Sequence, residues 1–260
     1  MNIVVLAKLV PDTEARLSVG SGSVDLASVE MVISPFDEYA LVEALRIKDA
    51  NADAKITVLM AGPETARKQI VNLLALGADD ATVIDDALDA ANPAAIAKVL
   101  AAEVRKLDAT TVFAGKQGVD YDWGMAAVAV AVDLGWPHVG VVKKFEPDFA
   151  GGTFKAISES DEGDLAFAGK LPAVVTADKA LNMVRYASLK GIMAAKKKPI
   201  TVHKLADAGV DAAALGAAKV DNVGLGYPAA RPAGRIITGE EPADKVRELV
   251  KCLREEARAI

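Results

Sequence analysis

The sequence predicts an α/β protein: an open, mostly parallel sheet with helices on both faces, an antiparallel edge meander and a C-terminal arm. Short apolar runs of strand length alternate with amphipathic helical stretches, which implies right-handed crossovers between parallel strands. The composition is 52% hydrophobic but only 5% aromatic, which suits Val-rich strands packed between Ala-faced helices. At 260 residues the chain is long enough to bury a large core.

The parallel strands are predicted from five apolar runs. They lie at residues 3–7, 56–60, 81–84, 110–114 and 173–177. The first helix is predicted from Ser34 as its N-cap, Pro35 in its first position and Asp37 in its first turn. Further helices are expected after Pro63 and Pro93, and another begins between Asp122 and Gly124.

The last third of the chain departs from this alternation. Between residues 143 and 168, polar and apolar residues alternate around two Gly-containing turns, which predicts an antiparallel meander at the edge of the sheet. Residues 204–237 are rich in Ala, Gly and Pro, and the final helix carries an apolar stripe through Val246, Leu249 and Leu253. We therefore expect a core of residues 1–203 and an arm of residues 204–260.

Charge and cysteine content exclude several classes of protein. A formal charge of −6 and a pI near 5.1 argue against nucleic acid or an anionic membrane as the main partner. The single cysteine, Cys252, provides neither a disulfide framework nor a metal cluster and fits a reducing compartment. No run of 18 apolar residues and no signal peptide are found, so we expect a soluble, cytoplasmic protein without stable membrane insertion.

The sequence also lacks the motifs of common catalytic sites. There is no Walker A loop, zinc spacing or nucleophile elbow, and His138 and His203 are far apart, so we expect no catalytic and no metal-binding residues. The most promising segment is the loop GKQGVDYDWG from Gly115, between a predicted strand and a predicted helix. A helix N-terminus there would bind a phosphate group. From the residues alone, an anion site and an ordinary Gly-rich turn remain equally open.

Several segments together resemble the beta subunit of electron transfer flavoproteins. They are SPFDEYALVEALRIK (34–48), AGPETA (61–66), GKQGVDYD (115–122), DLGWP (133–137) and LPAVVTADKALNMVRYASLKGIMAAKKKPI (171–200), in that order. The resemblance implies a nucleotide-binding core in a heterodimeric electron carrier, which passes electrons from dehydrogenases, such as acyl-CoA dehydrogenases, to a downstream acceptor. It implies an alpha subunit that holds most of the redox FAD, an AMP of structural role in this chain, and an arm that embraces the alpha subunit.

The resemblance also implies the cofactor-binding residues. They are Leu6, Ala7, Ser34, Pro35, Phe36, Asp37, Ala61, Gly115, Lys116, Gln117, Gly118, Val119, Asp120, Asp122, Trp123, Gly124, Met125 and Ala126. Phe36 matches a contact with the FAD across the subunit interface, although a core anchor would look the same. Relatives usually place side-chain donors where this chain has Gly124-Met125-Ala126, so phosphate binding would rest on backbone N–H groups and the helix dipole.

A second implied site is a partner-docking segment. Its residues are Tyr186, Leu189, Ile192 and Met193, with Leu189 inserting into the partner dehydrogenase. The alternative is that Leu189, Ile192 and Met193 form a buried helical face. Two other functions stay open: a subunit of an electron-bifurcating flavoprotein with a second FAD, and a stand-alone adenine-nucleotide-binding sensor. A nucleotide-hydrolysing enzyme is disfavoured by the missing phosphate motifs.

Overall fold

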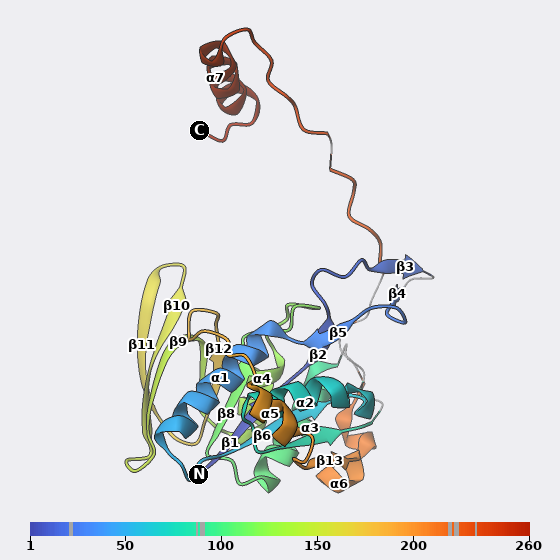
Figure 1. Cartoon of the computed structure of the whole chain (residues 1–260), viewed down its shortest axis with the longest axis vertical. Coiled ribbons are helices and arrows are strands. Elements are labelled where there is room, and N and C mark those ends of the chain that lie inside the picture. Colours follow the sequence, from blue (N-terminus) through green and yellow to red (C-terminus); the bar gives the residue numbers. More distant parts are fainter. Residues whose placement is uncertain (21–22, 87, 89–91, 218–219, 221–223, 232) are drawn as a thin grey trace. The chain divides into compact units, whose positions relative to one another are not determined.

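The computed structural model describes residues 1–20, 23–86, 88, 92–217, 220, 224–231 and 233–260. It divides into two compact units, Met1–Gly224 and Leu225–Ile260 (Figure 1). Among the described residues, no helix is both long enough and apolar enough to cross a membrane.

The first unit is built on a nine-stranded sheet with the order β11-β10-β9-β12-β8-β1-β6-β7-β13. Its parallel strands are β1 (Asn2–Leu6), β6 (Lys55–Ala61), β7 (Asp80–Ile84), β8 (Thr111–Gly115), β12 (Ala173–Ala177) and β13 (Ile200–His203). All five predicted strands are confirmed. β1 is central, and its Val5 lies opposite Val58 of β6 and Phe113 of β8.

The predicted edge meander is also confirmed. β9 (His138–Asp148) runs parallel to β12, and β10 (Thr153–Ser160) and β11 (Gly163–Lys170) follow in antiparallel pairing. The two predicted turns join these strands. Phe145 and Phe154 point from the meander into the core, and their ring centroids lie 5.4 Å apart.

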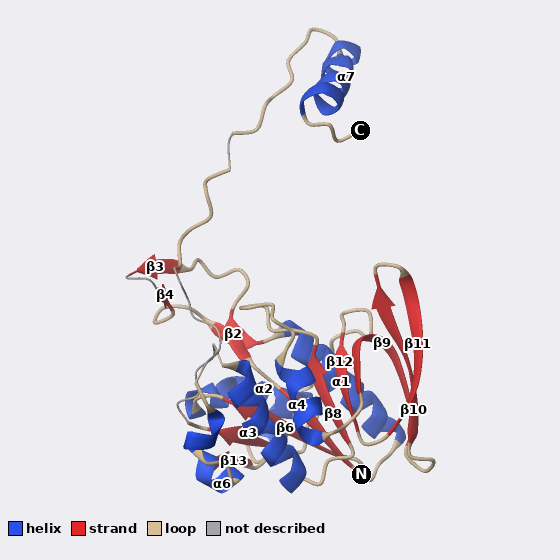
Figure 2. Cartoon of the chain, turned by 180° about the vertical axis from the view of Figure 1, so that it is seen from behind, coloured by secondary structure: helices blue, strands red, loops and turns tan. Residues whose placement is uncertain are grey.

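Helices cover both faces of the sheet, as the alternation of elements predicts (Figure 2). One face packs against α1 (Pro35–Ala50), α2 (Arg67–Leu76, after the 3-10 turn Glu64–Ala66) and α5 (Leu189–Ala195). The other packs against α3 (Pro93–Lys106), α4 (Ala126–Leu134) and α6 (Leu205–Ala208). β1 divides its side chains accordingly, because Ile3 belongs to the first apolar cluster and Val4 to the second.

The helix starts follow the expected caps in part. α1 begins at Pro35 after Ser34, but the Ser34 side chain makes no capping hydrogen bond. Asn92 does cap α3, because its side chain accepts a hydrogen bond from the N–H of Ala95. Four short strands between β1 and α1 were not predicted. They form two small antiparallel pairs, β2 (Leu9–Pro11) with β5 (Met31–Ile33) and β3 (Ser18–Gly20) with β4 (Ser23–Asp25).

The predicted arm is divided between the two units. α6 packs against α3 through Leu205 and Ala208, and a 3-10 turn (Ala212–Leu215) follows, so the first part of the expected arm lies on the core. The second unit contains α7 (Pro242–Lys251) and a π-helical turn (Cys252–Glu256). On this unit Val246 and Leu249 of the apolar stripe are exposed.

Candidate functional site

The expected cofactor residues gather at the carboxyl ends of β1 and β8. From β1 the chain crosses to β6 on one side, whereas β8 enters on the other side after β7. The strand order therefore reverses between β1 and β8. Open α/β sheets bind their ligands in the crevice at such a switch point. Leu6 and Ala7 lie at the end of β1, Gly115 at the end of β8, and Ala61 at the end of the neighbouring β6.

Asp37 ties the first turn of α1 to both strand ends. Its Oδ2 accepts the backbone N–H of Lys8 at 2.8 Å, and its Oδ1 accepts that of Gly115 at 2.8 Å. The residue is only 7% exposed. Burial raises the pKa of Asp37 to about 7, against the two N–H bonds and the Lys8 charge, which lower it. Asp37 thus holds the start of α1 against the ends of β1 and β8, at the base of the site.

Gly115 permits this close approach of α1 to β8. A Cβ at this position would lie 2.6 Å from the Cβ of Phe36 and 2.7 Å from Oδ1 of Asp37. Beside it, the Nζ atom of Lys116 lies 5.0 Å from the centroid of the Phe36 ring and 2.8 Å from a carboxylate oxygen of Asp178. Phe36 is half-buried, so part of its surface is available for a ligand or partner.

The loop after β8 is held by its own polar side chains. The Nζ atom of Lys8 lies 2.6 Å from Oδ2 of Asp120, and the Gln117 side chain donates a hydrogen bond of 2.8 Å to Asp122. The N–H of Asp122 donates to the carbonyl of Gly118 at 2.9 Å. Both loop carboxylates are therefore engaged by cationic or amide donors, which weakens their repulsion of an anion.

The start of α4 differs from the prediction. The helix begins at Ala126, not between Asp122 and Gly124, because Asp122 (φ 53°) and Gly124 (φ 58°) are in left-handed conformations that cannot enter a right-handed helix. Met125 precedes the helix and supplies no side-chain cap. The first N–H groups of α4 have no intrahelical acceptor, so they are the donors that a phosphate group needs.

Lys8 and Tyr121 belong to this cluster but were not among the expected residues. The Nζ atom of Lys8 lies 5.2 Å from the centroid of the Tyr121 ring, and that ring lies 5.0 Å from the ring of Trp123. Both aromatic side chains are exposed. The sequence did contain a signal for Lys8, because a lysine directly after the first strand falls at the carboxyl edge of the sheet.

The remaining expected residues lie in the same region. Ser34 donates its N–H to the carbonyl of Lys8 at 2.9 Å and its hydroxyl to that of Gln117 at 3.5 Å. Pro35 is exposed at the start of α1, and Val119 is half-buried in the loop. No three His, Cys, Asp or Glu side chains in the described part of the chain are grouped so that they could hold a metal ion.

The expected docking residues lie on a separate surface, around α5. Tyr186 is 97% exposed and Leu189 is 76% exposed, and Ile192 and Met193 are exposed as well. This excludes the alternative of a buried Leu189-Ile192-Met193 face. α5 contacts α2 instead through its small residues, because Ala195 is buried and Gly191 lies against the carbonyl of Ala75.

Comparison with known proteins shows the family. The family model described as electron transfer flavoprotein domain matches residues 22–208. A protein of Bradyrhizobium diazoefficiens named electron transfer flavoprotein subunit beta is 37% identical over 259 residues, which is 99% of each chain. A protein of the same name from Bacillus subtilis is 34% identical over 263 residues and covers 100% of both chains. The chain belongs to the electron transfer flavoprotein beta subunit family.

The family match extends beyond the core. The domain model ends at residue 208, but the two relatives cover nearly the whole chain, including the second unit that carries α7. A third beta subunit, from Clostridium acetobutylicum, is 39% identical over 218 residues, or 83% of each chain. The resemblance inferred from the sequence is therefore confirmed, and the first two relatives align with this chain over the arm as well as the core.

Proposed function

We propose that this chain is the beta subunit of a heterodimeric electron carrier. An alpha subunit would hold most of an FAD, through which electrons pass from dehydrogenases, such as acyl-CoA dehydrogenases, to a downstream acceptor. The observation that carries this proposal is the similarity to proteins named beta subunit over nearly the full chain. The exposed apolar stripe of α7 supports a partner subunit, because an amphipathic helix gains stability by burying such a face.

The nucleotide site that we propose in this chain is the cluster at the ends of β1 and β8. AMP fits the donors there, since its phosphate would bind the first N–H groups of α4, and Gly124 leaves room for close backbone approach. Lys8 would offset part of the negative charge. The missing side-chain donors on the first turn favour AMP over a second FAD, which a bifurcating protein would need.

The flavin chemistry belongs to the FAD, which exchanges one or two electrons when bound. The proposed tasks of this chain are to position the FAD and to present a docking surface. Phe36 is the residue that we expect to face the FAD held by the alpha subunit. Tyr186, Leu189, Ile192 and Met193 are expected to bind the dehydrogenase, because exposed apolar side chains in polar surroundings are typical interface hot spots.

The proposal is tested by co-expressing the chain with its alpha subunit and identifying the released nucleotides. One FAD and one AMP per heterodimer is the expected result. Two FAD would favour a bifurcating protein. A stable, flavin-free monomer that ignores the alpha subunit would refute the proposal.

The location of the AMP is tested with two matched glycine variants. Gly124 and Gly135 both have left-handed φ angles, of 58° and 69°, so alanine strains the backbone similarly at each. An added Cβ at Gly124 lies 3.1 Å from the carbonyl oxygen of Lys116, whereas at Gly135 it meets no atom within 4 Å. We expect Gly124→Ala to lose AMP and Gly135→Ala to keep it. Equal AMP content in both would show that the nucleotide lies elsewhere.

A further inference from the structure

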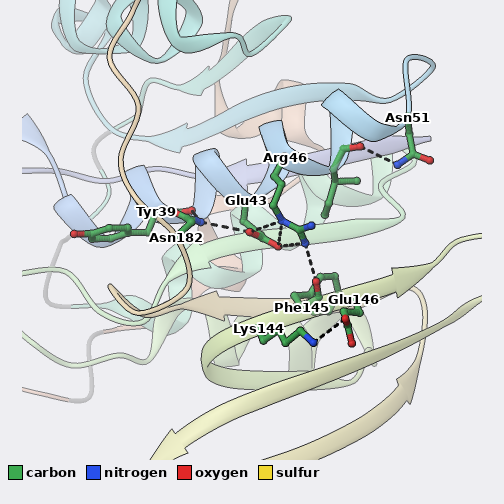
Figure 3. A network of polar contacts seen from close by, with 9 residues as sticks. Tyr39, Glu43, Arg46, Asn51, Lys144, Phe145, Glu146 and Asn182 are labelled. Carbon is green, nitrogen blue, oxygen red and sulfur yellow. Dashed lines mark hydrogen bonds and ion pairs between the residues drawn. The ribbon is translucent and has the colours of Figure 1, made fainter.

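A buried carboxylate in α1 connects three separate segments of the chain (Figure 3). Glu43 is 1% exposed and accepts hydrogen bonds from Arg46, at 3.0 Å from Nε and 2.6 Å from Nη2 to the same oxygen. Such a charge-assisted pair is stronger than a neutral hydrogen bond. Arg46 also donates from Nη2 to the backbone carbonyl of Phe145 in β9, at 2.8 Å.

The third segment is the stem of the docking surface, residues 181–188, which leads into α5. The Asn182 side chain donates to the carbonyl of Tyr39 at 3.0 Å and to Oε2 of Glu43 at 3.4 Å. Arg185 forms an ion pair of 2.8 Å with Asp49 near the end of α1. Both contacts attach the stem to α1.

The stem contains no helix or strand, so side-chain contacts hold it. Leu181 and Ala187 pack against the core, and Asn182 and Arg185 add polar contacts to α1. A segment without regular structure loses conformational entropy when it is held in one conformation, so side-chain contacts must compensate. α5 has an anchor of its own, since Lys198, just beyond it, donates to the carbonyl of Leu74 in α2 at 2.9 Å. Asn182 and Arg185 therefore hold the part of the docking surface that contains Tyr186.

We propose that Asn182, held by Glu43, is a positioning residue that fixes the docking surface in the conformation that the partner dehydrogenase binds. A preformed surface binds more tightly because less ordering remains to be done on association. The inference rests on the proposed docking function. It adds that the affinity for the dehydrogenase depends on a side chain that need not touch it.

The first measurement is the rate at which trypsin cleaves after Arg185, in the chain purified with its alpha subunit. Asn182→Ala removes the contacts with Tyr39 and Glu43 but leaves the trypsin site intact. We expect cleavage at this bond to be about tenfold faster, the factor that ~1.4 kcal/mol makes in an opening equilibrium. Glu146→Gln is the control, because Glu146 lies on β9 and pairs at 2.9 Å with Lys144 of the same strand and not with the stem.

The second measurement is reduction of the complex by its dehydrogenase. Asn182→Ala should raise KM with little change in kcat, flavin content or thermal unfolding temperature. In a Tyr186→Ala background the same substitution should have a smaller effect, because Asn182 holds the part of the docking surface that contains Tyr186. Asn182→Gln, which keeps the amide donor, should restore part of the loss.

The outcomes separate the role of Asn182 in holding the stem, its effect on dehydrogenase binding and the docking function itself. Unchanged cleavage after Arg185, or an equal increase in cleavage at sites throughout the core, would refute the inference that Asn182 holds the stem. Faster cleavage with an unchanged KM would overturn the positioning role. If Leu189→Ala itself leaves the dehydrogenase kinetics unchanged, the proposed docking function fails, and the cleavage rate still shows whether Asn182 holds the stem.

Discussion

Replacing Leu189 by alanine tests the docking surface most directly. Leu189 is 76% exposed, so about three quarters of its surface is available for burial in a partner. Full burial of a leucine contributes about 1.5 to 3 kcal/mol, and this exposed fraction corresponds to about 1 to 2 kcal/mol. The affinity for the dehydrogenase should therefore fall by about 5- to 30-fold. We expect this as a raised KM for the flavoprotein complex in stopped-flow or steady-state reduction by the dehydrogenase.

A matched control separates docking from a general loss of apolar surface. Val132 of α4 is 74% exposed but lies over the opposite face of the sheet from α5. Val132→Ala should leave the kinetics unchanged, and both variants should retain the flavin content and unfolding temperature of the wild type. The docking argument is refuted if Leu189→Ala reacts with the dehydrogenase as fast as Val132→Ala at all concentrations.

Two further predictions concern Gly115 and Asp37, at the base of the proposed nucleotide site. Gly115→Ala places a Cβ 2.6 Å from that of Phe36 and should lower the free energy of unfolding by about 1 to 3 kcal/mol, measured by denaturant titration. Gly20→Ala is the control, because its added Cβ meets no atom within 4 Å, and it should have little effect. Because burial raises the pKa of Asp37 to about 7, the folded protein keeps a proton here between about pH 4 and pH 7 that the unfolded chain releases. Wild-type stability should therefore fall as pH rises through this window, and Asp37→Asn should remove that part of the slope; parallel curves would contradict the assignment.

Much of the fold could be predicted because it depends on local patterns. Apolar runs without a charged residue indicated the strands that are buried on both faces. Pro35 marked the first position of one helix, and Pro93, after which another helix was expected, is itself the first residue of that helix. The four short strands between β1 and α1 were missed. They have three residues each and only two-stranded pairing, so neither length nor periodicity distinguishes them from a loop.

The sequence indicated which residues lie together in the candidate site but not how they contact one another. The family resemblance indicated which segments meet, and the parallel sheet explains why strand ends far apart in sequence lie together. It did not indicate that Asp37 binds two backbone N–H groups, one from Lys8 and one from Gly115. Nor did it indicate the left-handed conformations of Asp122 and Gly124, which delay the start of α4.

By itself, the sequence determined the α/β architecture, the edge meander and membership in the beta subunit family. Each of these can be recognised from short-range patterns or from the order of segments. Only the tertiary structure decided which side chains are buried or exposed. The burial of Asp37 and Glu43 and the exposure of Leu189 depend on packing between segments distant in the chain. A helical spacing of apolar residues is the same whether the helix faces the core or a partner, and only the neighbouring elements distinguish the two.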